Sequence, residues 1–94
     1  MGKYERRARE HAKEIQHCYD NAGSTGYSQA KYPYAEISNL LARAYDSKNN
    51  KKDAAIILIL KKTADPLMQE MKKRESQFVM EQKKRESLNR KFAE

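Results

Sequence analysis

The fold class depends most on one stretch, Lys51-Lys52-Asp53-Ala54-Ala55-Ile56-Ile57-Leu58-Ile59-Leu60-Lys61-Lys62. Its apolar centre has no clear period, so the pattern alone leaves a buried strand and a buried helix equally open. No other segment resembles a strand that would pair with it, and an unpaired strand would leave its backbone N–H and C=O groups without partners. We therefore predict a helix surrounded by protein, with Asn50 as its candidate N-cap.

A second helix is predicted upstream, over residues 3–21. Gly23 follows it and is well placed to end it in a left-handed conformation. The remaining positions of this segment are mostly charged, which indicates one core-facing stripe and one solvated side. The apolar residues recur every three or four positions, the period of an amphipathic helix; they are Tyr4, Ala8, Ala12, Ile15 and Tyr19.

Between these two helices the sequence predicts a polar loop followed by a further helix. Residues 21–28 are small and polar, and Pro33 disfavours helix at the residue before it, so we expect a loop of about ten residues. Pro33 suits the first turn of a helix that stops near Asp46. Its apolar face is formed by Tyr34, Ile37, Leu40, Leu41, Ala44 and Tyr45.

The chain is expected to break or kink at Asp65-Pro66 and to restart at Pro66 as the last helix, because proline lacks an amide hydrogen and restricts Asp65 before it. It runs to Phe92 and forms a rod of about 40 Å, whereas a compact chain of this length has a radius of gyration near 13 Å. We expect docking through residues 67–79 and a far end that projects or pairs with another molecule. The prediction is a single all-α domain, with a compact three-helix region over residues 1–64 and a long basic C-terminal helix over residues 65–94.

Composition and charge limit the classes of partner and the cellular environment that we expect. The 94 residues are 38% hydrophobic and 35% charged, so the core is small and partner binding would add burial. The net charge of +7 favours an anionic partner, such as nucleic acid or an acidic protein face. Cys18 is the single cysteine, and no apolar run approaches the roughly 20 residues of a membrane-spanning helix, so we expect a cytoplasmic protein without membrane contact.

The sequence contains one exact repeat. Lys72-Lys73-Arg74-Glu75-Ser76 returns as Lys83-Lys84-Arg85-Glu86-Ser87, at a spacing of 11 residues. On a helix this spacing is three turns plus about 20°, so matched residues align. A basic stripe about 27 Å long then lies opposite Met71 and could follow a phosphate backbone. The predicted nucleic-acid contacts are Lys72, Lys73, Arg74, Lys83, Lys84, Arg85 and Lys91.

Two alternatives explain the same charges. Glutamates at positions 70, 81 and 86 each precede an arginine by four residues, and such pairs stabilise a solvated helix by about 0.2–0.5 kcal/mol each. The second alternative is a coiled coil, and with it a homodimer through the C-terminal helix. Three of its nine heptad core positions would be charged, which disfavours a continuous seam.

A tyrosine cluster and one terminal phenylalanine are the candidate protein-binding residues: Tyr27, Lys31, Tyr32, Tyr34 and Phe92. Tyrosines beside a cation stack on bases or anchor interfaces. The structural alternative is that Tyr32 and Tyr34 pack over the junction between helices.

Catalytic and metal-binding residues are not indicated. His17 and Cys18 are adjacent and would point about 100° apart on a helix, and no second cluster of ligands exists elsewhere in the sequence. Nothing marks an acid or an oxyanion hole that would assist Cys18. We expect no catalytic residues, no metal site, no cofactor and no enzymatic activity.

The functional hypothesis is a small regulatory protein that acts by stoichiometric binding, through its basic C-terminal helix, to nucleic acid or a nucleic-acid-bound machine. One alternative is an inhibitor or adaptor that binds a protein through its tyrosines. The other is a homo-oligomeric helical assembly protein.

Overall fold

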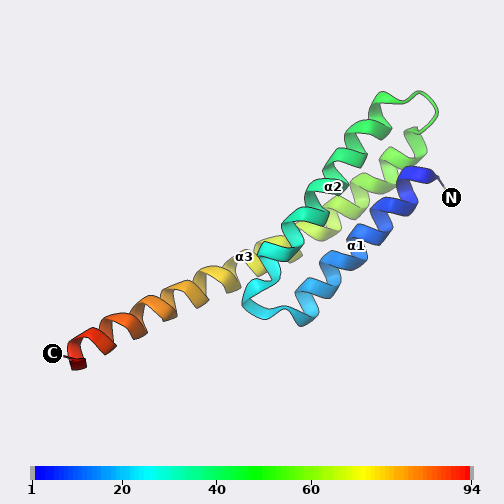
Figure 1. Ribbon diagram of the computed structural model, residues 1–94. Helices are drawn as coiled ribbons and strands as arrows, with labels where there is room; N and C mark the ends of the chain where they lie inside the picture. The colour runs from blue at the N-terminus through cyan, green and yellow to red at the C-terminus, as the bar shows by residue number, and fades with distance from the viewer. Residues whose placement is uncertain (1, 94) are drawn as a thin grey trace.

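The computed structural model describes residues 2–93, which form three α-helices and no strand. Helix α1 spans Lys3–Asn21, a short 3₁₀ turn, η1, spans Gly23–Thr25, α2 spans Gly26–Asp46 and α3 spans Lys51–Ala93. The three helices pack side by side, and α3 continues well beyond the other two (Figure 1). The predicted all-α class is confirmed.

Helix α1 has the predicted bounds and the predicted end. The amide of Ala22 donates to the Cys18 carbonyl at 3.0 Å, and Gly23 follows with a φ of +53°. This left-handed conformation costs glycine little because it has no Cβ. Gly23 therefore turns the chain from α1 into α2 within a few residues.

Helix α2 begins at Gly26, so the predicted start at Pro33 is wrong and the expected loop of about ten residues is much shorter. Pro33 lies inside the helix and is buried. Gly26 is buried too, and a Cβ there would lie 3.1 Å from the Cys18 carbonyl oxygen and 2.9 Å from the Met71 sulfur. The small residues Gly26 and Ala30 extend the buried face of α2 from Pro33 toward the N-terminus of the helix and let α2 approach its neighbours closely.

Helix α3 passes through Pro66 without ending, so of the break or kink predicted at Asp65-Pro66 the break is wrong. A proline inside a helix costs about 3 kcal/mol, since it removes one hydrogen bond and crowds the preceding turn. Met68 and Met71 are buried just after it. Burying one such side chain contributes about 1.5–3 kcal/mol, so packing offsets the cost of Pro66.

The core lies along one face of each helix. Its largest fully buried side chains are Ile15, Ile37, Ile57 and Met71. Within the apolar stretch only one face is covered, because Ile57 is fully buried while Ile59 is 63% exposed. The prediction of a helix surrounded by protein is therefore wrong, since a three-helix bundle covers only the inner face of each helix.

The ends of the helices near the α2–α3 connection are closed by polar contacts. Asp53, buried at the start of α3, accepts a hydrogen bond from the amide of Glu5 at 3.2 Å and so caps α1 from another helix. Asn50 holds the predicted cap position before α3, where its carbonyl accepts from the Ala54 amide at 3.0 Å. Its side-chain amide donates to the Ser47 hydroxyl at 2.7 Å.

The C-terminal part of α3 projects from the bundle, as predicted (Figure 1). All residues from Ser76 to Phe92 are exposed, and we call this segment the arm. Docking ends near Glu75, earlier than the predicted Val79, and Phe78 is already 46% exposed. The radius of gyration is 18.1 Å and the longest dimension is 67 Å. Within residues 2–93 no helix combines the length and the apolar character needed to cross a membrane.

Candidate nucleic-acid interface

The first copy of the repeat attaches α3 to the bundle through its arginine and its glutamate. The Arg74 guanidinium donates to the Tyr19 carbonyl at 2.8 Å and lies 4.3 Å from the centroid of the Tyr19 ring. The Ser28 hydroxyl donates to the Glu75 carboxylate at 2.9 Å. Arg74, a predicted nucleic-acid contact, is thus held against the end of α1.

The lysines of the repeat lie on the other side of α3. Met71 is fully buried and marks the direction of the core. At about 100° per residue, six basic side chains fall within a sector of about 120° on the side away from Met71. We call this surface the basic face; its members are Lys72, Lys73, Lys83, Lys84, Arg90 and Lys91.

For two arginines the prediction of nucleic-acid contacts differs from their position on the helix. Arg85 follows Arg74 by 11 residues and therefore lies on the core side of the helix axis, away from the lysines. Arg90 was missed by the prediction although it belongs to the basic face. The signal was its spacing of 18 residues from Lys72, which is about five full turns.

The carboxylates of this part of α3 lie outside the basic face. Between Pro66 and Phe92 the acidic residues are Glu70, Glu75, Glu81 and Glu86, and the last three fall on the core-facing half of the helix circumference. Glu70 lies about 100° from Met71, outside the sector of the six cations, and lines the same open surface as Lys72 and Lys73. Of the three predicted glutamate–arginine pairs, Glu70–Arg74 forms at 3.9 Å; within residues 2–93 the other two do not reach ion-pair distance. None of the six basic-face cations is within ion-pair distance of a carboxylate in the same described range.

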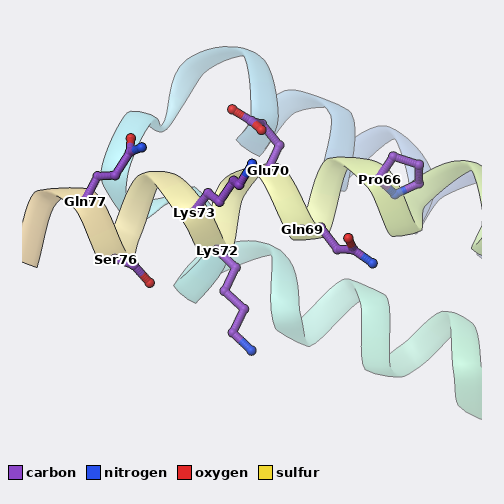
Figure 2. Close-up of a pocket in the computed structure, with 7 residues that line it drawn as sticks. All are labelled: Pro66, Gln69, Glu70, Lys72, Lys73, Ser76 and Gln77. Carbon is purple, nitrogen blue, oxygen red and sulfur yellow. The ribbon is translucent and has the colours of Figure 1, made fainter.

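Figure 2 shows the part of the basic face nearest the bundle. Lys72 extends toward α2, whereas Glu70 and Gln77 point to the opposite side of α3 (Figure 2). All residues lining this surface come from α3: Pro66, Gln69, Glu70, Lys72, Lys73, Ser76 and Gln77. It is therefore the open side of one helix, suited to an extended ligand rather than an enclosed small molecule.

The predicted tyrosine cluster is split. Tyr27, Lys31 and Tyr34 lie on one face of α2 and line a groove of about 260 Å³ against α3. Tyr32 is 68% exposed and lies outside the groove lining, with the Lys31 ammonium 5.4 Å from its ring centroid. Phe92 is 85% exposed near the far end of the arm.

Tyr34 is fixed in the α2–α3 groove by a polar contact. Its hydroxyl donates a hydrogen bond to the Asp65 carboxylate, and the Lys61 ammonium lies 5.9 Å from its ring centroid. Burial, followed by the hydrogen bond and the charge of Asp65, raises the pKa of Tyr34 to about 12. Tyr34 therefore packs over the helix junction, as the structural alternative predicts, whereas Tyr32 does not.

The residues considered for metal or nucleophilic chemistry are dispersed. Cys18 is buried, which together with the charge of Glu14 raises the pKa of its thiol. His17 is exposed and contacts Asn21, and His11 lies 3.5 Å from Glu14. Within residues 2–93 no three His, Cys, Asp or Glu side chains group as a metal site.

Comparison with known proteins returns no relative. No protein-family model matches the chain, and no curated protein or solved structure shows significant similarity to it.

Proposed function

We propose that this protein binds nucleic acid through the basic face of α3, without reading the base sequence. One observation supports this most: six cations occupy one side of a continuous helix over about 28 Å, with no carboxylate between them. Double-stranded DNA carries one phosphate charge per about 1.7 Å of its axis, so a stripe of this length faces many phosphates.

The types of side chain on the basic face favour phosphate contacts over base recognition. Five of the six are lysines, and a lysine ammonium is a flexible point charge without the planar geometry that reads a base edge. Contacts to phosphates position a protein on nucleic acid but carry no sequence information. We therefore expect similar affinities for oligonucleotides of unrelated sequence.

Salt dependence tests the proposal. If about six phosphates are contacted, the affinity for a labelled oligonucleotide, measured by fluorescence anisotropy, falls roughly a thousandfold between about 50 and about 200 mM salt. Exchanging both Lys83 and Lys84 for Gln lowers the slope of log affinity against log salt by about 1.8. A double exchange of Lys51 and Lys52, at the other end of α3, is the matched control and leaves the slope unchanged. A salt-independent affinity would contradict the proposal.

A protein-binding adaptor is the second candidate. It is favoured by two exposed aromatic residues, Tyr32 and Phe92, because aromatic anchors dominate many protein interfaces. The test is a pull-down from cell lysate at low and high salt, with and without nuclease. A single protein that is retained at high salt after nuclease treatment, and is lost when Tyr32 or Phe92 is changed to Ala, supports the adaptor. Capture that depends on low salt and on intact nucleic acid supports the first proposal.

A further inference from the structure

The α2–α3 groove is continuous with the basic face of α3. Gln69 and Lys72 line both the groove and the outer side of the helix. Lys72 extends toward α2 in Figure 2. A ligand that follows the basic face toward the bundle therefore reaches the groove at Lys72.

The groove has an order along its length. Gly26 packs against Met71, and Ser28 bonds to Glu75, so the first turn of α2 lies beside the end of the docked part of α3. Tyr27 is consequently at the end of the groove nearest the arm. Tyr34 lies at the other end, opposite Asp65.

Tyr34 and Tyr27 differ in the contacts that their side chains already make within the protein. The Tyr34 hydroxyl is committed to Asp65, and the Lys61 ammonium lies over its ring. Tyr27 is half-buried, and its hydroxyl has no hydrogen-bond partner in the described part of the chain. Lys31 and Lys72 supply positive charge from both walls of the groove. Tyr27 packs partly against the core, and the rest of its side chain lines the groove beside these two cations.

We propose that this groove receives one unpaired base of a single-stranded nucleic acid, stacked on Tyr27, while the flanking phosphates contact Lys31 and Lys72. The inference rests on the proposed function, because the strand would reach the groove along the basic face. Aromatic side chains stack on any base and alternate with cations in proteins that bind single strands. The bases of a duplex are already stacked on each other and do not enter such a groove.

The experiment measures affinity for a single-stranded oligonucleotide and for the duplex of the same length at one low salt concentration. Tyr27→Leu removes the aromatic ring and no charge, so single-strand affinity falls about tenfold while duplex affinity is unchanged. Tyr27→Phe retains single-strand affinity. Tyr32→Leu is the matched control, because Tyr32 lies outside the groove, and it leaves both affinities unchanged. Circular dichroism verifies that each variant keeps its helices.

Tyrosine fluorescence gives a second readout, since the chain has six tyrosines and no tryptophan. Single-stranded oligonucleotide quenches part of this emission in the wild type, and that part is absent in Tyr27→Leu. Equal single-strand affinities of the wild type and Tyr27→Leu overturn the inference, while salt-dependent binding of both leaves the proposed function standing. If the wild type binds neither form of nucleic acid, the proposed function fails first.

Discussion

The hydrogen bond from Tyr34 to Asp65 joins the middle of α2 to α3 beside Pro66. The bond requires a protonated phenol, and burial with this carboxylate raises the pKa of Tyr34 to about 12. An ordinary tyrosine in an unfolded chain has a pKa of about 10. The contact therefore makes the free energy of unfolding depend on pH in the alkaline range.

The direction of this pH dependence follows from proton binding in the folded and unfolded states. Between about pH 10 and about pH 12 the folded state holds the Tyr34 proton more tightly than the unfolded state, so stability falls as pH rises. Below about pH 10 the contribution is fully present. We expect Tyr34→Phe to lower the free energy of unfolding by about 1 kcal/mol at pH 8 and to flatten the alkaline decline. Urea unfolding between about pH 8 and about pH 12 measures the free energy of unfolding of each variant, with Tyr32→Phe as the exposed control. Equal pH profiles of Tyr34→Phe and the wild type would contradict the assignment.

At the scale of elements, the two prolines inside helices are the main conflict between local preference and observed structure. Pro33 is buried in α2, whereas Pro66 is exposed on α3. Both remove a backbone donor from their helix. Only the ring of Pro33 contributes packing to the interior, so the two positions respond differently to substitution.

We expect Pro66→Ala to raise the free energy of unfolding by about 2 kcal/mol, because alanine restores the hydrogen bond to the Lys62 carbonyl and loses no buried contact. Pro33→Ala gains the equivalent bond but loses the buried ring, so its net change is smaller. Chemical denaturation of both variants and the wild type measures this order. A Pro66→Ala variant no more stable than the wild type would indicate that α3 does not continue through residue 66 in solution.

At the scale of the whole molecule, the chain divides into a bundle that shares one core and an arm that shares none. The arm packs against no other helix in the described part of the chain, and most helical stability in proteins comes from tertiary packing. The arm therefore depends on its own charges or on a bound partner for order. Nucleic acid along the basic face would supply such a partner.

Hydrogen exchange tests this division. In the free protein, amides of residues 77–92 exchange much faster than core amides such as that of Ile57, because the arm opens without unfolding the bundle. Nucleic acid slows exchange in the arm if it binds the basic face. Slow exchange in the free protein, together with a mass in solution that rises with concentration, would instead indicate a homodimer through α3.

Several features of this protein could be predicted from interactions between residues close in the sequence. The all-α class, the bounds of α1, the left-handed Gly23 and the end of α2 at Asp46 follow from periodicity and chain-ending residues close in sequence. The alignment of the two repeat copies follows from helix geometry. The projection of the arm follows from the length of a helix compared with the size of a compact chain.

Other features depended on contacts between residues far apart in the sequence. Helices α2 and α3 remain continuous at their prolines because they pack against neighbouring helices, and this burial outweighs the free-energy cost of a proline inside a helix. The bundle decides that Ile57 is buried and Ile59 exposed, and that Arg74 docks on Tyr19 while Lys72 reaches the α2–α3 groove. A one-dimensional pattern cannot assign these roles, because equivalent side chains differ only in whether another helix lies opposite them.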